Sequence, residues 1–143
     1  MKVFYTDGSC SPNPGPGGWA VIENGQPIAL GAEKSSTNIR MEGQALIAAM
    51  KLANNNPCVI HTDSEFWINV ITKWAPGWEA KGWKKSKGDI KNLDLVKEAY
   101  SLYTVEPNTV KLVWVKAHVG TKDNELADEW ANKARKGVEL GSI

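Results

Sequence analysis

The chain has 143 residues, of which 42% are hydrophobic and 23% are charged, and its formal net charge is +1. No apolar run approaches the roughly 20 residues that a membrane-spanning helix needs, and the N-terminus lacks the layout of a secretory signal. Two cysteines and two histidines without ligand spacing argue against a disulfide framework and against a zinc site. We therefore expect a cytoplasmic protein in a reducing compartment.

The N-terminal part of the chain predicts three antiparallel strands joined by short turns. Residues 2–9 form the first strand. The run SPNPGPGG then turns the chain, because prolines fix φ and glycines accept positive φ. Residues 18–24 and 27–35 form the second and third strands, separated by the tight-turn signal NGQP.

The rest of the chain alternates between helices and strands. A helix begins at the capping residues Ser36, Thr37 and Asn38 and ends in an asparagine run. The later elements are a strand at 57–63, a helix at 64–74 capped by Ser64, a helix at 92–104, a strand at 109–118 and a helix from 121 or 122 to about 136. This order predicts an α/β fold, a five-stranded mixed sheet (three antiparallel strands, then two parallel) with helices on both faces. No linker divides the chain, so we expect one domain over residues 1–143.

The first strand places an acid among apolar residues. By the period of two, Val3, Tyr5 and Asp7 share one face, while Phe4 and Thr6 share the other. An unpaired buried charge is costly, so Asp7 needs to be protonated, paired or given a metal ion.

Three further acids are expected to converge with Asp7. Glu42 lies in the first turn of the first helix, Asp63 ends a strand, and Asp128 lies beside the apolar stripe of the last helix. Each alone has a structural explanation, as a helix cap, a partner of the helix dipole or the boundary of an amphipathic face. Together they repel one another unless cations neutralise them, and ligation by oxygen alone suits Mg²⁺ or Mn²⁺. Such sites catalyse phosphoryl chemistry with two ions about 3.5–4 Å apart.

Six blocks, which follow in order along almost the whole chain, resemble those of ribonuclease HI: TDGSCSPNPGPGG, TNIRME, TDS, WAPGWEAKGW, KNLDL and WVKAHVGTKDNELAD. The resemblance implies the ribonuclease H-like fold. It also implies an endonuclease that hydrolyses the RNA strand of RNA–DNA hybrids by two-metal-ion catalysis, leaving 5′-phosphate and 3′-hydroxyl ends. Two Mg²⁺ ions, or Mn²⁺ in their place, would be bound by Asp7, Glu42, Asp63 and Asp128.

The resemblance assigns further roles near this site. His118 matches a catalytic histidine that transfers a proton or assists product release, and Glu125 matches an acid that assists turnover. His61 has no such match, and we interpret it as structural. A basic handle at about 73–91 would grip the DNA strand, although from charge alone this segment is a solvated loop. The expected substrate-binding residues are Gly8, Ser9, Asn13, Thr37, Asn38, Glu65, Trp74, Trp78, Trp83, Lys84, Lys85 and Asn92.

The chain departs from the family pattern at four positions. Ile39 replaces an asparagine, Glu65 a glutamine, Val96 a tryptophan and Ala117 a glycine. These departures bear on substrate affinity and leave the four acids unchanged. Three other tryptophans are expected in the core: Trp19, Trp114 and Trp130.

Two other functions remain open. A non-catalytic hybrid-binding module would keep the fold, but a pure binder does not need four acids that repel phosphate when metal is absent. An excised domain of a reverse transcriptase would carry similar motifs. The basic handle, and a chain that starts at the first strand and ends soon after the last helix, favour a free-standing enzyme. We expect a monomer whose partner is the hybrid duplex, with no membrane partner and no small-molecule cofactor.

Overall fold

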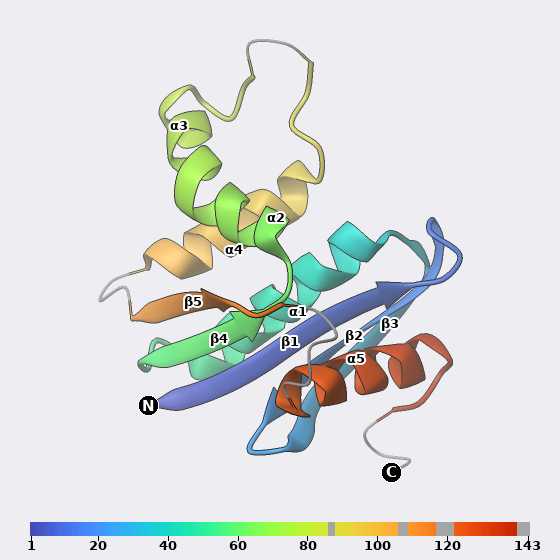
Figure 1. The fold of residues 1–143 in the computed structure, drawn as a ribbon. Helices are drawn as coiled ribbons and strands as arrows, with labels where there is room; N and C mark the ends of the chain where they lie inside the picture. Colours follow the sequence, from blue (N-terminus) through green and yellow to red (C-terminus); the bar gives the residue numbers. More distant parts are fainter. Residues whose placement is uncertain (86–87, 106–108, 117–121, 140–143) are drawn as a thin grey trace.

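A five-stranded mixed sheet organises the computed structural model, which describes residues 1–85, 88–105, 109–116 and 122–139. The strands are β1 (Lys2–Cys10), β2 (Gly15–Glu23), β3 (Gln26–Ser36), β4 (Cys58–Thr62) and β5 (Val110–Trp114). They lie in the order β3-β2-β1-β4-β5 (Figure 1). β1, β2 and β3 pair antiparallel, whereas β4 pairs parallel with both β1 and β5. The predicted α/β class and mixed sheet are confirmed.

Helices cover both faces of this sheet. They are α1 (Asn38–Ala53), α2 (Glu65–Asn69), the π-helical stretch η1 (Val70–Trp74), α3 (Ala75–Ala80), α4 (Leu93–Thr104) and α5 (Lys122–Arg135). α5 packs against β1, β2 and β3, and α1 packs against β1 and β2 with α4 on its outer side (Figure 1). None of the helices in the described ranges combines the length and hydrophobicity needed to span a bilayer.

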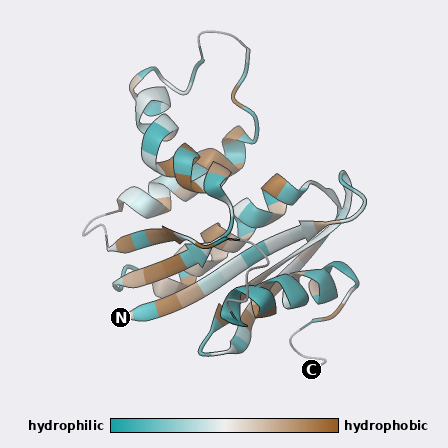
Figure 2. Cartoon of the chain, in the orientation of Figure 1, coloured by the Kyte–Doolittle hydropathy of each residue, from teal (hydrophilic) through white to brown (hydrophobic). Residues whose placement is uncertain are grey.

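The main core lies between the sheet and α1. Phe4, Leu46 and Ile60 are fully buried there together with Trp67, whose indole nitrogen donates to the Ile39 carbonyl at 2.7 Å. Hydrophobic residues gather on β4 and β5, whereas α5 is mostly hydrophilic (Figure 2). The apolar face of α1 is buried in this core, and its burial fixes the helix against β1, the strand that carries Asp7.

Two elements extend further than expected. β2 begins at Gly15 instead of residue 18, because glycines allow close packing there. A Cβ at Gly18 would collide with the backbone of Ala131 and Arg135 in α5, so only glycine fits at that point of the strand. The helix expected at 64–74 continues through η1 and α3 to Ala80. Pro76 lies in the first turn of α3, where a missing N–H is tolerated.

Other expectations are wrong in detail. The fifth strand ends at Trp114 instead of 118. Trp114 is 48% exposed and is not a core residue, because β5 is an edge strand. Trp19 and Trp130 are half-buried: Trp19 packs against the main core, while the Lys133 ammonium lies 4.2 Å from the Trp130 ring centroid. Val3, which shares its strand face with Asp7, is 41% exposed.

Candidate active site

Three of the predicted acids meet where β1 and β4 run side by side. Thr6 of β1 pairs with Thr62 of β4 in parallel register, so the next residues, Asp7 within β1 and Asp63 just after β4, lie side by side. Glu42 reaches the same place from the first turns of α1. Each of the three offers a carboxylate oxygen, and these atoms all lie within 4.8 Å of one another.

A glycine sets the distance between α1 and the strand. A Cβ at Gly8 would collide with the backbone of Met41 and Glu42, so the first turns of α1 lie directly against β1. Met41 is fully buried beneath this contact. The close approach explains how Glu42 comes beside Asp7. Gly8, expected to bind substrate, has this packing role in the structure.

The acid cluster (Asp7, Glu42 and Asp63) has the geometry of a divalent cation site. Two oxygens that share a Mg²⁺ ion at 2.0–2.1 Å lie at most about 4.2 Å apart, so the observed spacing is close to that of shared ligands. The donor set is oxygen only, which suits hard cations such as Mg²⁺ and Mn²⁺. The cluster therefore fits the metal that the sequence pattern indicates.

Burial and crowding disfavour the charged forms of these carboxylates. Asp7 is 5% exposed, and burial together with the charge of Asp63 raises its pKa to about 9. A hydrogen bond of 2.8 Å from the Gly8 N–H lowers this pKa but does not outweigh the other two causes. Burial and Asp63 also raise the pKa of Glu42 to about 7. Without cations the cluster therefore binds protons near neutral pH, and a divalent ion would replace them.

Asp128 lies next to this cluster but is not one of its three members. It is half-buried on α5, and its charge is one of the causes that raise the pKa of Asp7. Glu42 also contributes to that shift, so the charges of all three other predicted acids raise the pKa of Asp7. Asp7 is therefore the electrostatic centre of the four predicted acids. The role of Asp128 as a fourth ligand stays a prediction.

Ser64 is a site residue that the sequence reasoning treated only as a helix cap. Its hydroxyl oxygen accepts from the Trp67 N–H at 3.2 Å, and the hydroxyl also donates to the Glu42 carboxylate, which lowers the pKa of Glu42. Ser64 is buried. Its position directly after Asp63 was the available signal, because a hydroxyl beside a predicted metal-binding acid can orient a neighbouring carboxylate.

Several of the expected substrate residues hold protein segments together. The Ser9 hydroxyl donates to Asn132 Oδ1 on α5 at 2.6 Å, and Asn38 Oδ1 accepts from the Cys10 N–H at 2.6 Å. Asn13 Oδ1 accepts from the Asn38 N–H at 3.3 Å. These contacts place the loop after β1 against the start of α1. Direct contact of these residues with a substrate stays a prediction.

The handle residues lie in two places. Trp74, which is 44% exposed, and Trp78 line a largely apolar groove of about 710 Å³ beside Phe66, which we call the aromatic groove. Lysines also line this groove, at positions Lys73, Lys81, Lys85 and Lys91. Trp83 turns to Tyr100 instead, with ring centroids 6.0 Å apart, and packs against the core. Lys84 lies outside the lining of the groove and borders a smaller pocket beside Trp83.

The remaining expectations divide according to where the structure places them. Ile39 and Val96, two departures from the family pattern, both line the aromatic groove. Glu65 and Glu125 are exposed in the first turns of α2 and α5. His61 stacks on Tyr5 with centroids 4.3 Å apart, which agrees with a structural role. His118 and Ala117 lie outside the described residues.

Comparison with known proteins agrees with this geometry. Residues 1–136 match the protein family described as RNase H. The chain is 44% identical to ribonuclease HI of Xylella fastidiosa over 136 residues, covering 90% of this chain and 89% of that protein. It is 45% identical to ribonuclease H of Francisella philomiragia over 137 residues, covering 92% and 89%. LC9-RNase H1, described as a type 1 RNase H with the type 2 active-site motif, superposes with a TM-score of 0.83 at 28% identity, covering 98% of this chain and 74% of that one. These matches confirm the resemblance seen in the sequence, and the chain belongs to the RNase H family.

Proposed function

We propose that this protein is an endonuclease that hydrolyses the RNA strand of RNA–DNA hybrids at the acid cluster, leaving 5′-phosphate and 3′-hydroxyl ends. The observation that carries the proposal is the meeting of Asp7, Glu42 and Asp63 within 4.8 Å on this fold. Relatives that align with nearly the whole chain are named ribonuclease H or ribonuclease HI. A protein that only binds a polyanion has no use for a cluster of acids, because the cluster repels phosphate when no cation is present.

The proposed site uses Asp7, Glu42, Asp63 and Asp128 to hold two Mg²⁺ ions, with Mn²⁺ as a substitute. When bound, such ions supply an activated water and stabilise the leaving oxygen. The chain contributes the orientation of the ligands. The Gly8 N–H holds one oxygen of Asp7, and the Ser64 hydroxyl holds Glu42. The His118 imidazole is proposed to move a proton or to assist product release.

Selectivity for hybrids is proposed to come from two surfaces. Asn13, Asn38 and Asn92 would recognise 2′-hydroxyl and minor-groove groups, which only the RNA strand provides in full. The handle at about 73–91 would hold the DNA strand, with Trp74 and Trp78 packing on sugars while lysines contact phosphates. Few of these contacts read base edges, so we expect weak sequence preference.

We further propose a cytoplasmic monomer that folds as one domain over residues 1–143. One chain supplies all the proposed ligands and substrate contacts, so a second copy is not needed for activity. The two cysteines, Cys10 and Cys58, are free thiols, which suits a reducing compartment.

A nuclease assay with three labelled duplexes tests the function. RNA–DNA, RNA–RNA and DNA–DNA duplexes are each incubated with and without Mg²⁺, and we expect cleavage only of the RNA strand of the hybrid and only with the ion. Asp63→Asn should abolish turnover without unfolding the protein. Glu23→Gln is the matched control, because Glu23 is an acid paired with Lys2 at 3.8 Å away from the cluster. Hybrid binding without cleavage in either Mg²⁺ or Mn²⁺ would show a binding module instead.

A further inference from the structure

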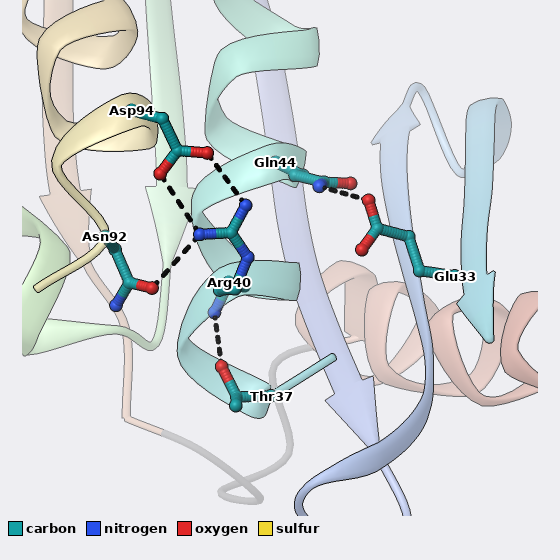
Figure 3. A network of polar contacts seen from close by, with 6 residues as sticks. All are labelled: Glu33, Thr37, Arg40, Gln44, Asn92 and Asp94. Atoms are coloured by element: carbon teal, nitrogen blue, oxygen red, sulfur yellow. Dashed lines mark hydrogen bonds and ion pairs between the residues drawn. The ribbon is translucent and has the colours of Figure 1, made fainter. Parts of the chain in front are cut away.

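A fork of hydrogen bonds from Arg40 joins the start of α1 to the start of α4. Arg40 Nη1 donates to Asp94 Oδ1 at 3.1 Å and Nη2 donates to Asp94 Oδ2 at 2.9 Å. Nη1 also donates to Asn92 Oδ1 at 3.1 Å (Figure 3). One guanidinium therefore binds a carboxylate with two bonds and an amide with a third, which is a geometry that only the planar arginine head supplies.

The Asn92 side chain does not do what asparagine ordinarily does at its position. Asn92 is the N-cap of α4, a place where an asparagine oxygen usually accepts from a backbone N–H of the first turn. Here the side chain makes no capping hydrogen bond, and the backbone is left-handed with φ 58° and ψ 34°. The amide oxygen is turned to the guanidinium instead (Figure 3).

This contact determines which end of the amide is free. A reversed amide would place its NH₂ group against a cation, donor against donor, so the oxygen must face Arg40. The Nδ2 group then points away from Arg40 and Asp94 (Figure 3). Nδ2 has no hydrogen-bond partner within the part of the chain that the structure describes. Arg40 thus leaves Asn92 with two free donors and no free acceptor facing away from the fork.

The surroundings of Asn92 match a donor of this kind. Asn92 lines a pocket of about 520 Å³ with Asn13, Pro14, Thr37, Ile39 and Lys91, and Asn13 Oδ1 already accepts from the Asn38 N–H. Thr37 Oγ1 already accepts from the Arg40 N–H at 3.2 Å, so its hydroxyl is left to donate. Lys91 is a cation, and Ile39 offers no hydrogen-bonding group. The pocket therefore presents donors to a ligand rich in acceptors, such as the phosphate oxygens of a nucleic acid strand.

We infer that Arg40 is a positioning residue for substrate binding, which acts by holding the Asn92 amide with its nitrogen toward the hybrid. Arg40 itself stays bound to Asp94 and does not contact the substrate. This inference rests on the proposed function and refines its binding step. The competing explanation is an exposed ion pair that only joins two helices, and such pairs contribute little to stability.

Steady-state kinetics on four variants separates the two explanations. In Arg40→Lys the charge remains, but the compact ammonium lacks the planar fork that binds Asp94 with two bonds and fixes Asn92 with a third, so we expect KM for the hybrid to rise about five- to tenfold. Arg40→Met and Asn92→Ala should raise KM by a similar factor, with kcat within about twofold of wild type. The double variant Arg40→Met/Asn92→Ala should be no worse than Asn92→Ala, because both changes remove the same interaction.

The chain offers a matched control further along the same two helices. Lys51 of α1 and Glu98 of α4 form an ion pair at 2.9 Å. Lys51→Met removes one charge and one α1–α4 contact, as Arg40→Met does, and should leave KM unchanged. Thermal melting of every variant checks that each is folded.

The outcomes decide the inference without ambiguity. A wild-type KM in Arg40→Lys would mean that only charge matters, and additive losses in the double variant would mean that Arg40 and Asn92 act separately. An equal rise of KM in Lys51→Met would point to helix docking or net charge. Each of these three results overturns the inference while the proposed function stands. If wild type did not cleave hybrids, the proposed function would fail instead, and the same comparison made on hybrid Kd in Ca²⁺ would still test Arg40.

Discussion

The acid cluster and the aromatic groove of the handle are built in opposite ways. The cluster takes one residue each from β1, α1 and the end of β4, and its members are buried or half-buried. The groove takes much of its lining from one continuous segment, α2 to α3, with exposed aromatics and lysines. A catalytic centre needs side chains held against their mutual repulsion, which only a packed core provides, whereas a surface that grips a flexible strand can be local and exposed.

The largest expected effect is on the cluster. Asp7→Asn should lower kcat by roughly a thousandfold or more, because it removes the carboxylate at the centre of the site. In EDTA the same variant should melt at a higher temperature than wild type, because it removes a carboxyl group that the folded protein must either protonate or bury as a charge, while an amide oxygen can still accept from the Gly8 N–H. Thermal melting and single-turnover cleavage measure the two effects. A loss of both activity and stability would show that Asp7 is structural.

A smaller effect is expected in the groove. Trp74→Ala should raise KM for the hybrid about tenfold, because an aromatic contact with a nucleotide contributes about as much as base stacking at the low end of roughly 1–3 kcal/mol, and kcat should change little. Trp114→Ala is the control, since Trp114 is similarly exposed but lies on β5. Equal effects of the two substitutions on KM would count against a specific role for the groove.

The pH dependence of stability is expected to come from the acid cluster. In metal-free protein the pKa of Asp7 is raised from 3.8 to about 9 and that of Glu42 from 4.5 to about 7. Between these values the folded state holds protons that the unfolded state has lost, so stability falls as pH rises from about 4 to about 9. We expect Tm in EDTA to be at least about 3 °C lower at pH 9 than at pH 5. Asp7→Asn, or added Mg²⁺, should flatten this dependence of Tm on pH. An unchanged dependence in both experiments would show that the acid cluster is not its cause.

The smallest expected effect comes from single lysines of the groove. Lys81→Ala should weaken hybrid binding only slightly at low salt and reduce the slope of log K against log salt by about 0.7–0.9, the value for one lost phosphate contact. Lys111→Ala, on the exposed side of β5, is the control. Binding titrations between about 50 and 200 mM salt measure both slopes. Identical slopes would place Lys81 outside the binding surface.

Much of the fold could be read from the pattern of residues. The strands were found by alternation and turn signals, and α1 by the Thr37 cap and its apolar stripe. The start of β2 was misplaced because a glycine run predicts a turn, and only tertiary packing explains the glycines in that strand: Gly18 lies against α5 and Gly17 against Met41 of α1. The helix from 65 to 80 was cut short at 74, since Pro76 and Gly77 weaken the local helix signal.

The candidate site divides in the same way. The identity of the acids could be predicted because each has a local signal: Asp7 alternates with apolar residues on a strand, Asp63 ends a strand, and Glu42 and Asp128 border the apolar stripes of helices. The partners of those acids could not, because the Ser64 contact with Glu42 and the Arg40 contact with Asn92 join residues 22 and 52 positions apart. Trp83 was assigned to the handle by the family resemblance, and in the structure it packs against Tyr100.

The sequence by itself determined the order of elements, the family and the residues able to bind a cation, because these depend on local periodicity and on residue chemistry. Only the tertiary structure decided that β1, β4 and α1 bring Asp7, Glu42 and Asp63 within 4.8 Å, and which way the Asn92 amide faces. The physical reason is that both depend on contacts between distant segments. The parallel register of β1 and β4 and the close approach at Gly8 bring the three acids together, and the Arg40 fork orients the Asn92 amide.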